Sequence, residues 1–188
     1  MNSHSHPILI LFFFLCSFSP FVHSADIEAG KNKAAFCLGC HGENANSKNP
    51  QYPTLAGQRA LYLESQIKAF QSGTRTSPVM QGMVAKLNKQ DIKNISAYLS
   101  TLPTESAGGD STLAKSGESK IMMCTGCHGR SAQGRSGFPK LAGQHPEYLK
   151  KQLLNFKDRS RKGGPMNNIS SSLSEQDIDA ISHYLGSL

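Results

Sequence analysis

The pattern Cys-x-x-Cys-His occurs twice in this chain and divides it into two similar halves. The first copy runs from Cys37 to His41, and the second, from Cys124 to His128, follows it 87 residues later. Further stretches match at an offset of 86 residues: 53–58 with 139–144, 62–63 with 148–149, 90–92 with 176–178, and 98–99 with 184–185. The repeat predicts two related units of about 80 residues, and a unit that small has a marginal hydrophobic core by itself.

The spacing within each pattern is that of covalent haem attachment. Cysteines three positions apart can add to the two vinyl groups of a porphyrin, and a histidine directly after them can bond the iron. The predicted attachment residues are Cys37, Cys40, Cys124 and Cys127, and the predicted iron ligands are His41 and His128. Disulfides or thioredoxin-like chemistry are the alternatives, but neither accounts for a histidine after both cysteine pairs. Two covalent haem c groups would also give each small unit an apolar surface to fold around.

A sixth iron ligand is predicted from the methionines. Among those beyond the first 24 residues, only Met80 and Met166 occupy matching positions in the two halves. Each lies in a proline-containing stretch that we expect to be non-helical, and a thioether ligand favours ferrous iron. We therefore predict Met80 as a ligand of the first haem iron and Met166 as a ligand of the second. Met83, Met122 and Met123 are unmatched and are expected to fill the core.

Two matched prolines are candidates for orienting the histidines. Pro53 and Pro139 follow the two haem-motif histidines by twelve and eleven residues. A backbone carbonyl there could accept the other ring N–H and hold the imidazole in place, although an ordinary turn proline is the alternative. His145 and His183 have no counterpart in the first half and are expected to be surface or packing residues.

Matched arginines and tyrosines suggest contacts to the haem. Arg75 and Arg161 precede the two methionines, and a guanidinium is a natural partner for a haem propionate. Exposure to solvent is the alternative reading for both. Tyr62 and Tyr148 could contact haem edges or propionates, with packing in the core as the alternative.

The pattern of apolar residues is helical throughout. Helices are predicted over 26–36, 60–71, 88–99, 113–123 and 174–185. Asn88 and Ser174 are the expected N-caps of the last helix in each unit. No stretch alternates apolar and polar residues, so the predicted class is all-α. A linker-like composition over 101–112 places the boundary near residue 107, with one domain over 25–106 and the other over 107–188.

Residues 1–24 are predicted to be a secretory signal. An apolar run over 8–15 precedes small residues, and cleavage is expected between Ser24 and Ala25, which would place the protein in the periplasm. A retained membrane anchor is the alternative, but the run is short for a span of about 20 residues. The formal net charge of +7 is spread over both halves without a dense basic tract, so a nucleic acid is not an expected partner. A mildly basic surface suits transient docking on acidic proteins.

These features together resemble the class I cytochromes c and, among them, the dihaem cytochrome c4 family. The resemblance rests on both haem motifs, both Pro-x-Leu-Ala-Gly-Gln segments, the two methionine stretches and the last helix of each unit, and it covers residues 25–188. It implies two domains packed as a pseudo-symmetric pair, with the propionate edges of the haems facing each other. It also implies close contact of the first and last helices at Gly30 and Gly117, near Tyr98 and Tyr184.

The resemblance implies electron transfer without catalytic side chains. The expected function is a periplasmic carrier that takes electrons from a cytochrome bc complex or a dehydrogenase and passes them to a haem–copper terminal oxidase. An electron-transfer subunit of an enzyme complex, such as a flavocytochrome sulfide dehydrogenase, is the alternative. A dihaem peroxidase is a third reading, and methionine at both matched positions argues against its open iron site.

Overall fold

The computed structural model of the chain describes Met1 and residues 24–188, so the predicted signal segment lies outside the described residues apart from its two ends. Residues 24–188 are helical, with an isolated bridge between Arg135 and Phe138 and no longer strand among them, which confirms the all-α prediction. The elements are α1 (Ile27–His41), η1 (Glu43–Ala45), α2 (Ala60–Gln71), α3 (Pro78–Val84), α4 (Lys89–Thr101), α5 (Ser111–Glu118), α6 (Met122–His128), α7 (Pro146–Lys157), α8 (Pro165–Ser171) and α9 (Glu175–Ser187). None of the helices within 24–188 is long and apolar enough to cross a membrane.

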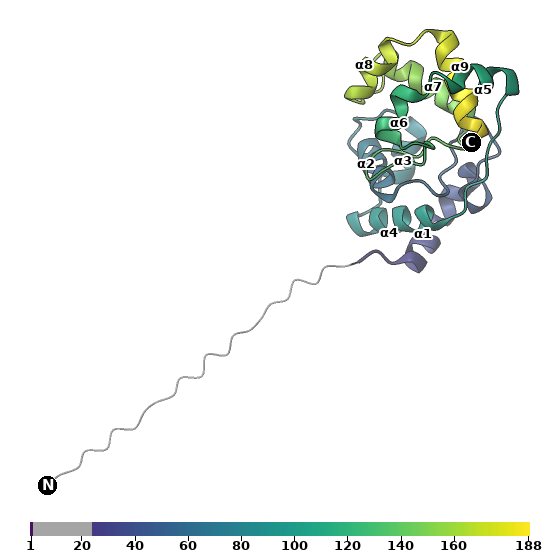
Figure 1. Cartoon of the computed structure of the whole chain (residues 1–188). Helices are drawn as coiled ribbons and strands as arrows, with labels where there is room; N and C mark the ends of the chain where they lie inside the picture. The colour runs from purple at the N-terminus through teal and green to yellow at the C-terminus, as the bar shows by residue number, and fades with distance from the viewer. Residues whose placement is uncertain (2–23) are drawn as a thin grey trace.

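Each unit is closed by a contact between its first and last helices. Figure 1 shows α1 against α4 at one end of the molecule and α5 against α9 at the other. A Cβ at Gly30 would overlap the carbonyl oxygen of Asn94 and lie 3.0 Å from Cβ of Tyr98. In the second unit, Gly117 meets the carbonyl of Ala180 in the same way. Glycine is required because the helix backbones touch, as the resemblance implied.

The last helix of each unit carries its core. Asn88 and Ser174 cap α4 and α9, each in a capping box with an aspartate, as predicted. The expected apolar stripes are at most 2% exposed: Ile92, Ile95 and Leu99 on α4, and Ile178, Ile181 and Leu185 on α9. Buried residues form one cluster around each stripe, so the chain has two separate hydrophobic cores.

The repeated Pro-x-Leu-Ala-Gly-Gln segment ties the haem motif to the last helix. In the first unit the N–H groups of Leu55 and Ala56 donate to the carbonyl of Ala45 at 2.9 and 3.1 Å. The N–H of Gly57 donates to the carbonyl of Leu99 at 2.9 Å, with a φ of +64° that suits glycine. The same bonds recur in the second unit, so the segment has one structural role in both.

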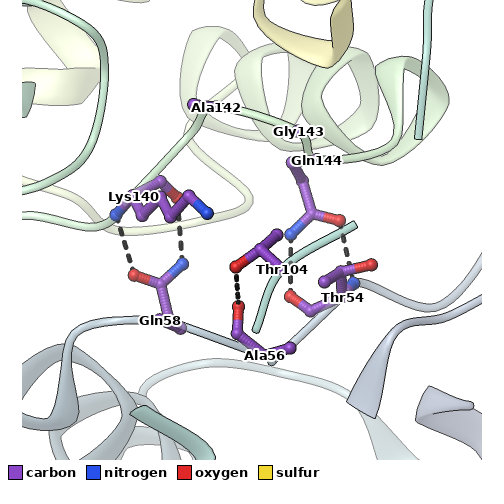
Figure 2. Close-up of a pocket in the computed structure, with 8 residues that line it drawn as sticks. All are labelled: Thr54, Ala56, Gln58, Thr104, Lys140, Ala142, Gly143 and Gln144. Atoms are coloured by element: carbon purple, nitrogen blue, oxygen red, sulfur yellow. Dashed lines mark hydrogen bonds between the residues drawn. The ribbon is translucent and has the colours of Figure 1, made fainter. Parts of the chain in front are cut away.

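The final glutamine of each segment crosses to the other unit. Gln58 Nε2 donates to the carbonyl of Lys140 at 2.9 Å, and the N–H of Lys140 donates to Gln58 Oε1 at 2.8 Å. Gln144 makes the equivalent pair with the backbone of Thr54, with both distances 2.9 Å (Figure 2). Gln58 and Gln144 are buried, and because each amide bonds a backbone in the partner unit, the two contacts are related by the pseudo-twofold axis.

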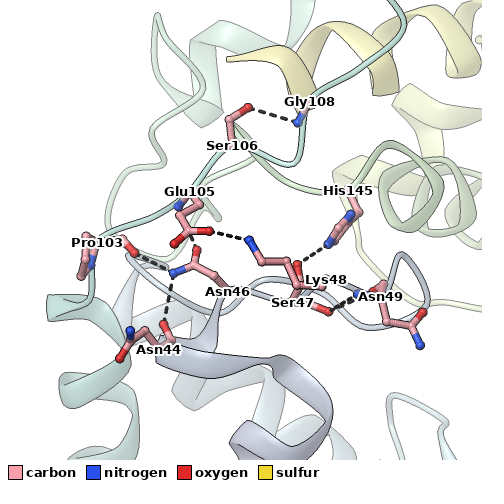
Figure 3. Close-up of polar contacts among 10 residues, drawn as sticks. All are labelled: Asn44, Asn46, Ser47, Lys48, Asn49, Pro103, Glu105, Ser106, Gly108 and His145. Atoms are coloured by element: carbon pink, nitrogen blue, oxygen red, sulfur yellow. Dashed lines mark hydrogen bonds and ion pairs between the residues drawn. The ribbon is translucent and has the colours of Figure 1, made fainter.

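The connection between the units is also held by side chains. Asn46 Nδ2 donates to the carbonyl of Pro103 at 2.9 Å, and Asn46 Oδ1 accepts the N–H of Glu105 at 2.8 Å. Glu105 also pairs with Lys48 at 2.6 Å (Figure 3). His145 is a buried packing residue whose Nε2 lies 2.8 Å from the carbonyl oxygen of Ser47, across the interface. The linker is therefore bonded to the first unit rather than free.

The prediction of one helix over 113–123 is wrong in part. α5 ends at Glu118 and α6 begins at Met122, whereas α1 continues unbroken through its haem motif. Ile121 occupies the position of Ala34, which is fully buried in the first unit. An isoleucine does not fit an alanine-sized space, so the chain turns here instead of continuing the helix.

The glycine contact leads to a stability prediction. Gly30→Ala should lower the free energy of unfolding by about 1–3 kcal/mol, because the added methyl group would force α1 and α4 apart. Denaturant unfolding of the purified protein measures this change. Asn32→Ala is the matched control, because Asn32 is an exposed residue of the same helix outside the Cys-x-x-Cys-His pattern. The control should be neutral or slightly stabilising, and equal losses in both variants would contradict the packing role of Gly30.

Candidate functional site

The cysteine pairs lie at the carboxyl ends of α1 and α6. Cys37 and Cys124 are half-buried, Cys40 and Cys127 are exposed, and none of the four forms a disulfide. Burial raises the pKa of the Cys37 thiol to about 11 and also raises the pKa of Cys124. Thiol–disulfide exchange of the thioredoxin type needs a lowered thiol pKa. The environment of these pairs therefore speaks against the thioredoxin-like alternative.

The two predicted histidine ligands are the last residues of α1 and α6. His41 and His128 are each 6% exposed. Nδ1 of His41 lies 2.8 Å from the carbonyl oxygen of Pro53, and Nδ1 of His128 lies 2.9 Å from that of Pro139, which confirms the predicted orienting role of both prolines. A carbonyl only accepts, so Nδ1 carries the proton. Burial lowers the pKa of both imidazoles, which favours neutral rings with Nε2 available to a metal.

The two predicted methionine ligands lie on short helices, so the prediction of non-helical stretches is wrong. Met80 is on α3 and Met166 is on α8, and both side chains are half-buried. Pro78 and Pro165 each occupy the first helical position, where the N–H has no intrahelical partner to lose. Proline therefore starts these helices rather than preventing them.

The unmatched methionines do not fill the core. Met83 is 40% exposed, Met122 79% and Met123 55%, so the expectation of core packing is wrong for all three. Of the methionines beyond the signal segment, only the matched pair is sheltered. The matched and unmatched methionines therefore differ in exposure, although the unmatched ones are not in the predicted environment.

Each methionine helix is bonded to the helix that precedes it. Next to the second predicted ligand, Asn167 Nδ2 donates to the carbonyls of Phe156 at 2.7 Å and Arg161 at 2.8 Å. In the first unit, Gln71 Nε2 on α2 donates to the carbonyl of Val84 at the end of α3, also at 2.8 Å. Sequence comparison missed Asn167 and Gln71 because neither residue is repeated: Asn167 corresponds to Gln81, and Gln71 corresponds to Lys157. Lys157 donates to the carbonyl of Leu173, as Gln71 does to that of Leu87.

Six matched side chains form what we call the arginine cluster at the interface between the units. Its members are Arg75, Arg161, Tyr62, Tyr148, Gln66 and Gln152. The guanidinium of Arg75 donates to Tyr148 Oη at 2.8 Å and to Gln152 Oε1 at 3.0 Å, both in the second unit. It also donates to Gln66 Oε1 in its own unit at 2.7 Å.

Arg161, in the second unit, makes the equivalent contacts to the first unit. Arg161 donates to Tyr62 Oη at 3.0 Å and to Gln66 Oε1 at 2.8 Å in the first unit, and to Gln152 Oε1 at 2.6 Å in its own. Each guanidinium also lies over a phenylalanine ring of its own unit. The distance from the guanidinium carbon to the ring centroid is 4.6 Å for Arg75 and Phe70 and 4.5 Å for Arg161 and Phe156.

The arginine cluster corrects the alternative of solvent-exposed arginines. Arg161 is 9% exposed, and Arg75 is half-buried. Neither is in an ion pair with a carboxylate of residues 24–188. Two sheltered positive charges without a carboxylate partner make this interface a favourable place for an anionic group. The tyrosines Tyr62 and Tyr148 bond the partner unit's arginine instead of packing only within their own core.

The surroundings of both histidines fit a covalent haem. Large apolar side chains next to the motifs or to a predicted methionine ligand are exposed: Phe36, Tyr52, Val79, Met122, Met123 and Phe138. Tyr52 and Phe138 stand edge-on to His41 and His128, with ring centroids 6.2 and 6.1 Å apart. Exposed apolar surface of this kind calls for a cover, and a porphyrin bonded to both thiols would supply it. Thiols, a neutral imidazole and a thioether are also the donor set of c-type haem.

Comparison with known proteins agrees with this arrangement. The sequence profile of the Cytochrome c family matches residues 27–103 and again 115–188. Cytochrome c4 from Pseudomonas aeruginosa is 39% identical over 182 residues, which cover 88% of this chain and 90% of that protein. The crystal structure of reduced recombinant cytochrome c4 from Pseudomonas stutzeri has a TM-score of 0.83 at 36% identity and covers 88% of this chain and 100% of that one. A thiosulfate dehydrogenase electron acceptor from Stutzerimonas stutzeri is 31% identical over 179 residues, or 86% of this chain and 83% of that protein. The chain therefore belongs to the dihaem cytochrome c4 family, with two tandem cytochrome c domains that bind two covalent haem c groups.

Proposed function

We propose that this protein is a periplasmic electron carrier that accepts electrons from a cytochrome bc complex or a dehydrogenase and delivers them to a haem–copper terminal oxidase. The observation that carries the proposal is the equivalence of the two centres. Each has a carbonyl-oriented histidine and a half-buried methionine on a separate helix. Such a pair would leave no open iron position for a substrate, and no catalytic side chain is needed.

The proposed attachment and ligand residues follow the repeat. Cys37 and Cys40 would hold the first haem, with His41 and Met80 on its iron, and the iron would cycle between its ferric and ferrous states. The equivalent residues of the second centre are Cys124, Cys127, His128 and Met166. The chain's own task is to hold the donor atoms still: the proline carbonyls orient the imidazoles, and the bonds to α2 and α7 fix the methionine helices. Rigid ligands keep the reorganisation that accompanies each electron small.

The arginine cluster is the proposed partner of the haem propionates. Its two guanidiniums lie between the units and lack a carboxylate partner among residues 24–188. Carboxylates are the preferred partners of guanidinium groups. Propionates placed there would bring the two haems edge to edge across the interface. In this proposal the mature protein begins at Ala25, after export, and the two domains meet near residue 107.

The second candidate is an electron-transfer subunit of an enzyme complex, such as a flavocytochrome sulfide dehydrogenase. It is favoured by the similarity to a thiosulfate dehydrogenase electron acceptor. The two functions share the same haem chemistry and differ in whether the redox partner is transient or permanent. Purification in native conditions separates them, because a permanent subunit co-elutes with a larger enzyme.

The attachment residues can be tested by removing one pair. Cys37→Ala combined with Cys40→Ala should leave one covalent haem per chain, because only the second pair can still form thioethers. Mass spectrometry of the denatured protein counts the covalent haems. The equivalent double variant at Cys124 and Cys127 is the matched partner and should give the same count. Two covalent haems in either variant would refute the assignment.

The methionine ligands can be tested one at a time. Met80→Ala should lower the reduction potential of one haem by roughly 0.1 V, since loss of the thioether removes its preference for ferrous iron. The same haem should then bind carbon monoxide. Met83→Ala, on the same helix, is the control and should change neither property. Met166→Ala should act on the other haem, and a spectrum unchanged by either ligand substitution would exclude that methionine.

The function as a whole is tested by an optical redox titration. We expect two haems per chain with positive potentials that do not bind carbon monoxide in the unmodified protein. A haem that binds the gas, or one with a low potential, would mean that one iron lacks methionine and would favour an enzyme over a carrier.

A further inference from the structure

The two domains differ in charge next to their methionine ligands. Residues 146–166, from the start of α7 to Met166, contain six basic and two acidic residues. The equivalent residues 60–80, from the start of α2 to Met80, contain two basic residues and one acidic residue. The net charge is therefore +4 in the second domain and +1 in the first. Since the arginine of the arginine cluster is common to both, the difference lies in residues that the repeat does not share.

Three of these cations are exposed and make no ion pair within residues 24–188. We call them the basic segment: Lys151 on α7, and Arg159 and Lys162 in the turn that joins α7 to α8. Their counterparts in the first domain are Ser65, Gly73 and Thr76, all uncharged. The remaining basic side chains here are engaged: Lys150 with Asp179, Lys157 with the carbonyl of Leu173, and Arg161 in the arginine cluster.

Arg159 has a backbone conformation that is unfavourable for a residue with a side chain. Its φ is +64°, in the left-handed region, and its counterpart Gly73 has a φ of +73°. Glycine adopts this conformation without cost, whereas a residue with a Cβ does not. The neighbouring Asp158 is exposed, and its hydrogen bonds to Ser160 lower its pKa, so this carboxylate offsets one positive charge of the turn.

The turn is held close to the second predicted iron ligand. The N–H of Arg161 donates to the carbonyl of Asn155 at 2.8 Å, which folds the turn back against α7, one helical turn beyond Lys151. The N–H of Met166 donates to the carbonyl of Gly163 at 3.2 Å, directly after Lys162. The basic segment is therefore attached at both ends to elements that fix the methionine side of the second haem.

We propose that the basic segment is the docking site for a redox protein with an acidic surface, and that the second domain is the one through which electrons pass to or from that partner. This inference rests on the proposed carrier function. Complementary charge raises the rate of encounter and selects the orientation of the complex. A partner drawn to the basic segment meets the second haem, whereas the uncharged counterpart in the first domain offers it no preference. The charge difference thereby selects the second domain for electron exchange with the partner, although the two centres are otherwise alike.

The test measures electron transfer to an acidic protein of known redox chemistry. Oxidised plastocyanin, a copper protein with an acidic patch, takes one electron as Cu(II) becomes Cu(I) and one haem passes from Fe(II) to Fe(III). The variant K151S/R159G/K162T gives the second domain the residues of the first. Its second-order rate constant should fall about tenfold at low ionic strength. At high ionic strength, where charges are screened, the variant and the unmodified protein should react at equal rates.

A variant with the same net charge separates docking from a general charge effect. K31S/K86S/K115S removes three cations that are exposed and unpaired within residues 24–188, but lie elsewhere on the molecule. Its rate should stay within about twofold of the unmodified protein. An equal loss in both variants, or no loss in the first, would overturn the proposal.

Two further measurements keep the outcomes distinct. Pelleting with phosphatidylglycerol vesicles tests whether the basic segment binds a membrane surface instead of a protein. If K151S/R159G/K162T lowers vesicle binding but leaves the plastocyanin reaction unchanged, the partner is a lipid surface and the proposed protein partner is refuted. Redox titration of every variant checks the centres themselves. If all titrations are normal and K151S/R159G/K162T reacts with plastocyanin as fast as the unmodified protein, only the docking site is refuted. An abnormal titration of the unmodified protein would refute the carrier function.

Discussion

The backbone contact between the first and last helices is the constraint on which each domain depends. At Gly30 and Gly117 a helix approaches the carbonyl of its partner so closely that no side chain fits. This crossing places the end of the last helix where Leu99 and its counterpart accept the N–H of the glycine in the Leu-Ala-Gly-Gln segment. That segment begins with the proline whose carbonyl orients the histidine. Hydrogen bonds and helix packing thus connect the glycine contact, the loop and the predicted haem ligand of each domain.

The interface uses the same repeated residues for a second purpose. Gln58 and Gln144 complete the Leu-Ala-Gly-Gln segments and bond the partner's backbone in reciprocal pairs. The arginine cluster adds a second reciprocal set, in which each guanidinium reaches a tyrosine and a glutamine of the other domain. A pseudo-twofold axis makes each favourable contact occur twice. The two centres are therefore held in one relative position, which electron exchange between two haems requires.

The two domains differ away from the histidine sites and the interface between them. α1 is continuous whereas α5 and α6 are separated by a turn, and the methionine helices are bonded to their neighbours by different side chains. The basic segment belongs to the same class of difference. Positions that orient the histidines or join the domains are under the same geometric demand in both copies. Residues on the outer surface are not constrained by these contacts, so the two domains can differ there in charge.

The sequence by itself determined the two units and their helical class, and it predicted the residues of both centres. Cysteine spacing, the matched methionines and the capped apolar stripes are local or periodic signals, and the repeat supplied an internal comparison for each one. Only the tertiary structure decided that Pro78 and Pro165 begin helices, that the chain breaks before Met122, and that Arg75 and Arg161 reach across to the partner domain's tyrosines. Proline at a first helical position and proline in a loop look alike in sequence. A hydrogen bond between residues 73 positions apart, such as that of Arg75 with Tyr148, depends on how two folded domains meet, which no local pattern records.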